Sequence, residues 1–327
     1  MPRTPGLTHR ISHRGAVAPW VFVLMFAACG GDSRSPMATE ESVASVTVAP
    51  VANTVVIGGT VRLTATANDA AGNRLTGRQV TWSSSNTDIA LVTAGIVTGV
   101  ADGLSTITAT AEGKSGTASV TVKALVFASV SAGGYHTCGV TTDGTTYCWG
   151  RNEDGQLGND DVDLLSRATP DLVACGLIFG SVDAGLTHSC GLTTDGTAYC
   201  WGGNFGGQLG NGTTIDAGTP VAVSGALSFA LVSAGRSHTC ALTTEGTGYC
   251  WGGNGDGKLG NGSLADISVP VAVSGGLILS SVSTGGFHTC GLTTDATAYC
   301  WGGNSDGQVG DGSTTNRTTP VLVLGQQ

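Results

Sequence analysis

Apolar and polar residues alternate along most of the chain, in short runs separated by glycine- and asparagine-rich segments. Because the side chains of a strand point alternately to its two faces, this period of two predicts half-buried β-strands. Between residues 42 and 123 the runs are Val46–Val48, Val61–Ala67, Val80–Trp82, Ile107–Thr110 and Val120–Val122. Strands this short, with turns between them, predict a separate β-sandwich domain.

From residue 124 the alternation becomes a repeat. The stretch His136–Gly150 returns as His188–Gly202, His238–Gly252 and His288–Gly302, and its first cysteine recurs at intervals of 52, 50 and 50 residues. A strand precedes each stretch, and a Trp-Gly pair, an asparagine, a Gly-x-x-Gly turn and a further short strand complete each unit. A fixed period of this size is typical of supersecondary units that stack side by side.

Each repeated stretch predicts a β-hairpin. Loop 142–144, centred on Asp143, ends in glycine, where the backbone must enter the left-handed region. This centring places Cys138 opposite Cys148, and facing residues on antiparallel strands lie close enough for a disulfide. The fourth copy has Ala296 in the glycine position, so we expect its turn to be strained or differently shaped.

The same register predicts one disulfide within each hairpin. The four bridges are Cys138–Cys148, Cys190–Cys200, Cys240–Cys250 and Cys290–Cys300. Two of the ten cysteines are left over, and Cys175, which has no equivalent in the other units, is expected to be free. Paired cysteines in hairpin register indicate an oxidising compartment.

The composition agrees with an all-β protein. Glycine is abundant, with 53 residues, only 11% of residues are charged, and long helix-forming runs are absent. The formal net charge is −9, and the chain is more acidic still without residues 1–28, which carry arginines and no acidic residue. An acidic body without a basic cluster argues against nucleic acid and anionic lipid as partners.

Residues 1–28 have the features of an export signal. Three arginines precede an apolar run, residues 16–28, which is too short to span a bilayer. Residues 26–29 resemble the lipobox of bacterial lipoproteins, whose cysteine carries lipid and becomes the mature N-terminus. Ordinary signal-peptidase cleavage is the competing interpretation, but it would put Phe26 or Met25 where that enzyme needs a small residue.

We therefore favour Cys29 as a lipidation site. The protein is then expected to be exported and held at the cell envelope, on the outer membrane or the cell surface, with the lipid as its only membrane contact. Residues 29–41 are rich in small and polar residues and predict a flexible tether.

Residues 42–123 resemble a bacterial Ig-like domain of group 2. The resemblance rests on residues 80–86, 95–99, 103–109 and 116–122 in that order. Domains of this family are often spacers or adhesive modules on exported proteins. This one contains no cysteine, so Trp82 is expected to anchor its core.

Residues 124–327 resemble regulator of chromosome condensation repeats. The resemblance rests on the hairpin, the Trp-Gly pair and the Gly-x-x-Gly turns at 155–158, 207–210, 257–260 and 307–310. It implies a β-propeller with four-stranded blades, and such propellers usually close with about seven. With four repeats, an open arc, a small ring and a partial propeller completed by association all stay open.

His136 and Cys138 also have the spacing of a metal-ligand pair or a Cys–His nucleophile. The same pair occurs in every repeat, whereas a catalytic site is usually single and a packing requirement recurs in each unit. We therefore interpret the four histidines as buried hydrogen-bonding residues between blades: His136, His188, His238 and His288.

Residues 152–155 and 304–307 hint at calcium loops. They lack the spaced carboxylates and terminal glutamate of a specific site, and tight Asx and glycine turns are the better interpretation. We assign no catalytic residue, metal or cofactor, and expect the protein not to be an enzyme.

Function is then expected where the repeats differ. Aromatic and arginine side chains are the usual anchors of protein interfaces, and the residues of these types at variable positions are Tyr135, Arg151, Phe205, Arg236 and Phe287. We predict a lipid-anchored, non-catalytic protein whose propeller binds an unknown surface or secreted protein. The alternative is a cell-surface adhesive or polysaccharide-binding structural protein, for which the ligand is a glycan.

Overall fold

The computed structural model describes residues 41–161, 164–174 and 176–326. The predicted export signal, the predicted lipidation site at Cys29, almost all of the predicted tether and Cys175, which was expected to be free, lie outside these residues. Every regular element in the described ranges is a β-strand, which confirms the all-β class. No described segment forms a helix that is long and apolar enough to cross a membrane.

The first ten strands form the N-terminal domain. They make three sheets, with strand orders β1-β4-β5, β2-β10-β9-β6 and β3-β8-β7. The strands are β1 (Ser45–Ala49), β2 (Ala52–Val56), β3 (Thr60–Arg62), β4 (Thr64–Asn68), β5 (Arg74–Leu75), β6 (Thr81–Ser84), β7 (Ala90–Thr93), β8 (Ile96–Gly99), β9 (Gly103–Ala111) and β10 (Lys114–Lys123). β2 runs parallel to β10, and the other pairs are antiparallel.

One apolar core holds this domain together. Burial alternates along β9 and β10, where Ile107, Ala109 and Val120 are fully buried. Each large apolar side chain removed from water in this way contributes about 1.5–3 kcal/mol. Trp82 is partly buried and packs against the same cluster, so it supports the core from the side rather than filling its centre.

One predicted strand is two strands in the structure. The run Val61–Ala67 alternates throughout, but β3 ends at Arg62 and pairs with β8, whereas β4 begins at Thr64 and pairs with β1. Leu63 lies at the change of sheet; its side chain is buried and its N–H donates to the Gly95 carbonyl at 2.7 Å. Alternation alone could not show this break, because both strands keep the same period.

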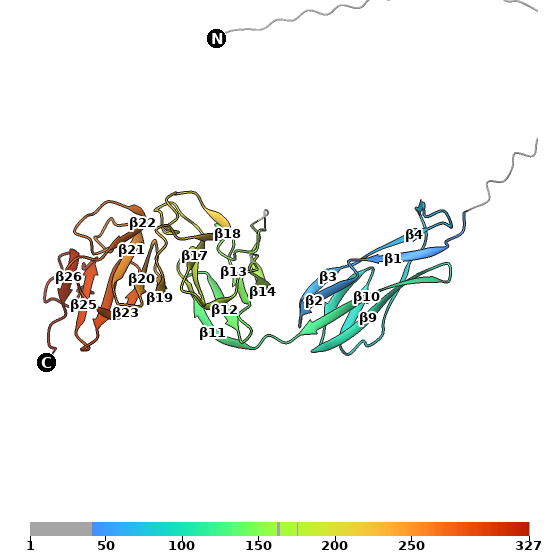
Figure 1. The fold of residues 1–327 in the computed structure, drawn as a ribbon, viewed down its shortest axis with the longest axis horizontal. Coiled ribbons are helices and arrows are strands. Elements are labelled where there is room, and N and C mark those ends of the chain that lie inside the picture. Colours follow the sequence, from blue (N-terminus) through green and yellow to red (C-terminus); the bar gives the residue numbers. More distant parts are fainter. Residues whose placement is uncertain (1–40, 162–163, 175, 327) are drawn as a thin grey trace, which may run out of the picture. The chain divides into compact units, whose positions relative to one another are not determined.

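The remaining strands form four antiparallel four-stranded sheets, one for each repeat and each in chain order (Figure 1). The first repeat has β11 (Phe127–Ala132), β12 (His136–Thr141), β13 (Thr146–Gly150) and β14 (Arg167–Leu172), and the second has β15 (Phe179–Ala184), β16 (His188–Thr193), β17 (Ala198–Gly202) and β18 (Ala217–Ala222). The third has β19 (Phe229–Ala234), β20 (His238–Thr243), β21 (Gly248–Gly252) and β22 (Ile267–Ala272), and the fourth has β23 (Leu279–Thr284), β24 (His288–Thr293), β25 (Ala298–Gly302) and β26 (Arg317–Leu322).

Successive sheets pack face to face. We call the side of a sheet that carries its cysteine pair the cysteine face, and the opposite side the tryptophan face. At the first interface, Val140 and Leu157 from the cysteine face of the first repeat pack with Phe179, Val182 and Trp201 from the tryptophan face of the second. The second and third interfaces repeat this arrangement, so the array contains three copies of one apolar layer.

Two local features refine the sequence interpretation. Pro170 lies within β14, the outermost strand of its sheet. An outer strand tolerates proline because one edge needs no ladder donor. The turn of the fourth hairpin keeps the shape of the others, since Ala296 takes a φ of 66° where Gly144 has 81°, so the cost of alanine is strain rather than a new turn.

Candidate functional site

The repeated hairpin has the register that its turn predicts. Cys138 faces Cys148, and Gly139 faces Tyr147. A disulfide joins the facing cysteines in each of the four repeats, at Cys138–Cys148, Cys190–Cys200, Cys240–Cys250 and Cys290–Cys300. The bridges lie inside the single repeats, so another set of contacts must join one repeat to the next.

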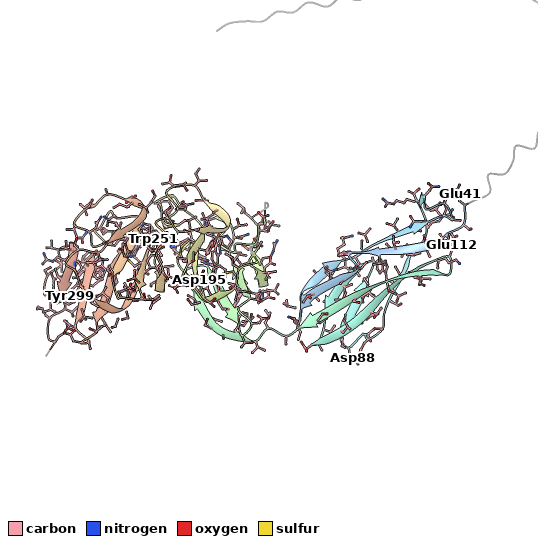
Figure 2. The ribbon with its side chains drawn as sticks, viewed as in Figure 1. Glu41, Asp88, Glu112, Asp195, Trp251 and Tyr299 are labelled. Carbon is pink, nitrogen blue, oxygen red and sulfur yellow. A yellow bond between two sulfur atoms is a disulfide. The ribbon has the colours of Figure 1, made fainter. Side chains whose placement is uncertain are left out.

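A chain of hydrogen bonds crosses each interface between repeats. At the second interface His188 Nε2 lies 2.9 Å from Thr239 Oγ1. Both Thr239 Oγ1 and Trp251 Nε1 donate to the Gln208 carbonyl, each at 2.9 Å (Trp251 is labelled in Figure 2). The same pattern recurs as His136–Ser189 with Gln156 and Trp201, and as His238–Thr289 with Lys258 and Trp301.

These contacts define the protonation state of the histidines. Because the hydroxyl hydrogen is used on the carbonyl, the imidazole must donate from Nε2, which leaves Nδ1 as the bare nitrogen. In His136, His188 and His238 the Nδ1 atom is buried without a hydrogen-bond partner. Burial lowers the pKa of His136 to about 4 and that of His188 to about 3, and it holds the pKa of His238 well below its usual value. A neutral histidine held in this way positions neighbouring sheets.

The fourth histidine is an exception to the sequence interpretation. His288 was expected to be buried between blades, but it is only partly buried. It lies on the cysteine face of the fourth repeat, and the described chain provides no further sheet to pack against that face. Within the described residues, the prediction is wrong for His288 because no sheet covers the cysteine face of the fourth repeat.

The asparagine after each Trp-Gly pair stabilises a turn. Asn152 is fully buried, and its Oδ1 accepts the Leu157 N–H at 3.1 Å. Its counterparts Asn204, Asn254 and Asn304 are buried in the same way and accept from Leu209, Leu259 and Val309. Residues 152–155 and 304–307 thus contain an asparagine that caps its own turn, and the described residues contain no cluster of three or more His, Cys, Asp or Glu arranged to hold a metal.

The variable residues lie at one end of the sheets. Tyr135 directly precedes β12, and Arg151 directly follows β13. Because these strands are antiparallel and His136 faces Gly150, the two flanking loops meet. The equivalent loops of the other repeats have the same place, and we call these loops together the loop end of the array.

The structure pairs four of the five predicted binding residues. The guanidinium carbon of Arg151 lies 5.3 Å from the ring centre of Tyr135, within the first repeat. That of Arg236 lies 4.9 Å from the ring centre of Phe287, so this pair joins the third and fourth repeats. Phe205 is exposed and comes from the second repeat, without an arginine from this set. All three aromatic side chains are exposed, at 57%, 73% and 47% for Tyr135, Phe205 and Phe287.

Charged residues lie near these pairs. Arg151 forms ion pairs with Glu153 at 2.7 Å and with Asp154 at 3.7 Å. Lys258 occupies the position of Gln156 and Gln208; it lies 3.8 Å from Asp256, and burial lowers its pKa. The exchange of glutamine for lysine in one Gly-x-x-Gly turn was the signal that could have identified it.

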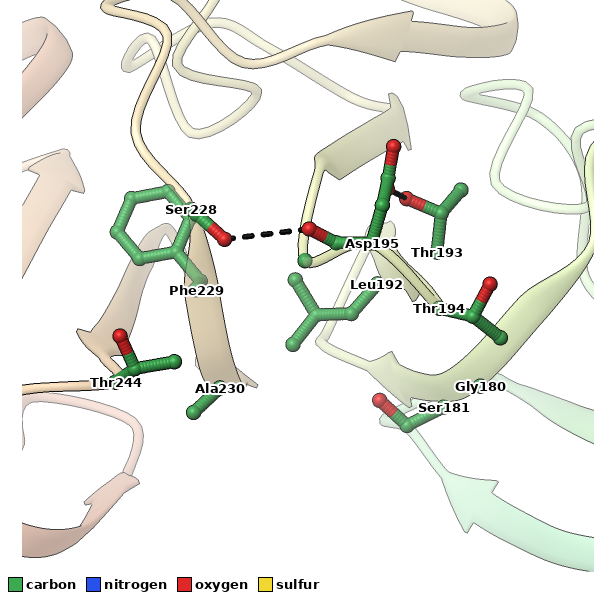
Figure 3. Close-up of a pocket in the computed structure, with 11 residues that line it drawn as sticks. Gly180, Ser181, Leu192, Thr193, Thr194, Asp195, Ser228, Phe229, Ala230 and Thr244 are labelled. Carbon is green, nitrogen blue, oxygen red and sulfur yellow. Dashed lines mark hydrogen bonds between the residues drawn. The ribbon is translucent and has the colours of Figure 1, made fainter.

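The opposite end of the array contains a polar hollow. It lies between the second and third repeats, has a volume of about 480 Å³, and is lined by hydroxyl side chains such as Ser181, Thr194 and Thr244 (Figure 3). On one side Ser228 Oγ donates to the Asp195 carbonyl at 3.2 Å. Phe229 also lines it but is almost completely buried, so the hollow offers no open aromatic ring.

Family comparisons assign both parts of the chain. The model described as "Regulator of chromosome condensation (RCC1) repeat" matches residues 143–192, 195–242, 245–292 and 295–327, which is more than half of the chain. The chain belongs to the RCC1 repeat family. A second model, for a bacterial Ig-like domain of group 2, matches residues 42–122.

Curated relatives share short stretches of the RCC1 repeats. A protein RCC2 homolog from Danio rerio is 40% identical over 85 residues, which are 25% of this chain and 17% of that protein. Human protein RCC2 is 38% identical over 103 residues, or 31% of this chain and 19% of that protein. The chain therefore spans less than about a fifth of the length of either relative.

Solved structures share the fold of the array. Yeast RCC1 (Prp20), in its complex with Kap60, aligns with a TM-score of 0.55 at 19% identity, over 69% of this chain and 60% of that one. Human WBSCR16 aligns with a TM-score of 0.56 at 18% identity, over 68% and 65% of the two chains. At such low identity the likeness shows the fold alone, an RCC1-type β-propeller architecture.

The RCC1 repeats thus divide into shared and individual parts. The disulfide, the histidine, the tryptophan and the asparagine recur, and all of them hold the sheets and turns. The arginine–aromatic pairs occur once each, at the loop end. Within the described residues, the loop end is the part of the array that combines exposure, aromatic side chains and opposite charges.

Proposed function

We propose that this protein is a non-catalytic binding protein whose RCC1 repeats capture a protein partner at the loop end. The observation that carries the proposal is the pair of exposed arginine–aromatic contacts, Arg151 with Tyr135 and Arg236 with Phe287. Each contact holds a large ring in a fixed orientation before any partner arrives. A preorganised anchor loses less conformational entropy on binding, so more of its contact energy contributes to affinity.

The known structures of the fold support protein binding. Yeast RCC1 has been crystallised with Kap60, and a study of Prp20p from Saccharomyces cerevisiae describes its binding to Gsp1p and histones. Those partners belong to those proteins. For this chain we infer a surface or secreted protein, because its acidic charge and export features do not suit a nuclear or nucleic-acid-bound role.

A protein suits the loop end better than a glycan does. The loop end combines aromatic rings with arginines and carboxylates, the mixture that anchors protein interfaces. The hydroxyl-lined hollow at the other end is the feature closest to a sugar site, and its one aromatic residue, Phe229, is buried. Adhesion to polysaccharide is therefore the second candidate.

Binding at the loop end can be tested by affinity capture. The oxidised protein is compared with a Tyr135→Ala/Phe287→Ala variant for capture from surface and secreted fractions, with Ile278→Ala, an exposed residue at the opposite end of the sheets, as the matched control. We expect the double variant to lose a protein that the wild type and the control both retain. Equal capture by all three proteins, or retention of glycan alone, would contradict a protein-binding loop end.

We also propose that the protein is exported and anchored by lipid on Cys29. The arginine-rich start, the short apolar run and the lipobox-like residues 26–29 support this, and the four disulfides suit an oxidising compartment. The Cys29→Ser variant should leave the membrane fraction and lose incorporation of labelled fatty acid. A wild-type protein that begins at Ala28, or that is wholly soluble, would contradict the anchor.

A further inference from the structure

The two outer faces of the array expose the residues that its interior interfaces bury. On the tryptophan face, Val182, Val232 and Val282 are 8%, 8% and 7% exposed, whereas Val130, their equivalent in the first repeat, is 62% exposed. On the cysteine face, Val140, Leu192 and Leu242 are buried, whereas Leu292 of the fourth repeat is 41% exposed. The first repeat thus presents a tryptophan face on which Val130 is exposed, and the fourth a cysteine face on which Leu292 is exposed.

The fourth repeat also keeps an open place for a tryptophan. A side chain at Gly158 would collide with Trp201, since an added Cβ would lie 2.7 Å from the indole nitrogen. Gly210 and Gly260 stand at the same distance from Trp251 and Trp301. The fourth glycine, Gly310, has no tryptophan nearby and meets only Val323. The backbone keeps the shape of the site, because Gly310 has a φ of 72° and Gly158 one of 67°.

The groups that form the hydrogen bonds between repeats are also divided between these two outer faces. Thr137 stands in the first repeat where Ser189, Thr239 and Thr289 receive a histidine from the repeat before. Trp149 is partly buried in the first repeat, where its counterparts Trp201, Trp251 and Trp301 are fully buried. The fourth repeat presents His288 and the Gln308 carbonyl, the partners that a threonine and a tryptophan in these places would need.

We propose that a second copy of this chain docks head to tail, with the tryptophan face of its first repeat against the cysteine face of the fourth. In this interface His288 donates to Thr137 of the other copy, and Trp149 of the other copy fills the site at Gly310 and donates to the Gln308 carbonyl. Val130 and Leu292 are buried in the same layer. The interface is a fourth copy of the contact that the chain already makes three times.

The two outer faces of the array are complementary to each other, and this identifies a second copy of the chain as the occupant. Each exposed face matches the other one and not itself, so the contact is heterologous, and such contacts close into rings when the rotation allows. Two copies supply eight repeats, which is within the known range of about four to eight blades for propellers. A ring of two copies covers both faces of both chains and leaves both loop ends exposed.

Sedimentation of the whole chain tests this proposal. Wild-type protein should have the mass of two copies across a concentration series. Val130→Asp and Leu292→Lys each place a charge in the apolar layer, and each variant should sediment as one copy. Ile215→Asp, on an exposed loop away from both faces, is the matched control and should keep the mass of two copies.

Mixing the two variants makes the test specific for a head-to-tail contact. In an equimolar mixture, the intact Leu292 face of the first variant meets the intact Val130 face of the second, and the other contact pairs the new carboxylate with the new ammonium group, so the mass of two copies should return. Circular dichroism of each variant alone should match the wild type, which excludes unfolding as the cause of dissociation. A wild type that stays a single copy, a mixture that stays dissociated, or assemblies that grow beyond two copies would overturn the proposal.

Discussion

The Ig-like domain and the RCC1 repeat array reach stability by different routes. The Ig-like domain has one apolar core, centred on residues such as Ile107 and Val120, and contains no cysteine. The array has no single centre; it repeats a disulfide inside each unit and a His–hydroxyl–carbonyl contact between units. The difference teaches that residues common to all repeats maintain the scaffold, and that binding must be sought where the repeats diverge.

Reduction of the disulfides should produce the largest difference in stability between the two regions. Each disulfide closes a loop of sequence separation 10, so by the chain-entropy model each contributes about 2–3 kcal/mol. Since a domain is stable by only about 5–15 kcal/mol, the loss of four bridges should unfold the array. Calorimetry with and without reductant should show the array transition disappear while that of the Ig-like domain stays, and two unchanged transitions would contradict this.

Low pH should produce the second-largest difference, because it should destabilise the array and not the Ig-like domain. The buried histidines have folded pKa values far below the unfolded value of about 6.5, at about 4 for His136 and about 3 for His188. The unfolded chain therefore binds more protons below pH 6.5, and stability is lost as the pH falls, by up to about 1.4 kcal/mol per histidine per pH unit. The described Ig-like domain contains no histidine.

Urea unfolding of the array from pH 7 to pH 4.5 measures this effect. The array's midpoint should fall with pH, and a His188→Gln variant should show a shallower fall. A midpoint that does not change over this range would contradict a neutral, buried role for the histidines.

A cavity in the Ig-like core should destabilise the Ig-like domain and leave the array unchanged. Ile107→Ala removes a fully buried side chain, and such truncations cost about 2–5 kcal/mol. Because the core is specific to that domain, the calorimetric transition of the Ig-like domain should move to lower temperature. The exposed Leu104→Ala on the same strand is the control. A shift of the array transition instead would show that the two regions share one core.

The smallest expected effect concerns the turn of the fourth hairpin. Ala296 has a positive φ of 66°, a conformation that costs a non-glycine residue about 1–2 kcal/mol. Ala296→Gly should raise the stability of the array by about 0.5–1 kcal/mol after the added chain entropy of glycine is subtracted. Gly246→Ala, at the same position of the third hairpin, should lower it, and the same sign for both would contradict the argument.

Most of the fold could be predicted from local sequence patterns. The hairpin register follows from loop 142–144 and the two cysteines, because turn position and strand period together fix which residues face each other. The break at Leu63 was missed, because a change of sheet does not interrupt the alternation.

The contacts at the loop end were predicted only in part. The sequence shows which positions vary, and so it identified Tyr135 and Phe287 as candidates. It could not show that Arg236 reaches Phe287 from another repeat, or that a threonine completes the histidine contact, because both depend on how sheets stack. The partial exposure of His288 was missed for the same reason, since its environment depends on a neighbouring sheet.

The central claim is that shared residues hold the array while the variable ones serve binding, and urea unfolding of two variants tests it directly. His188→Ala removes a fully buried interface residue and should lower the free energy of unfolding of the array by about 2–4 kcal/mol. Tyr135→Ala/Phe287→Ala removes only the two exposed cation–π contacts, worth about 0.5–1 kcal/mol each. A loss for the double variant as large as that for His188→Ala would mark the loop-end residues as scaffold and contradict the account.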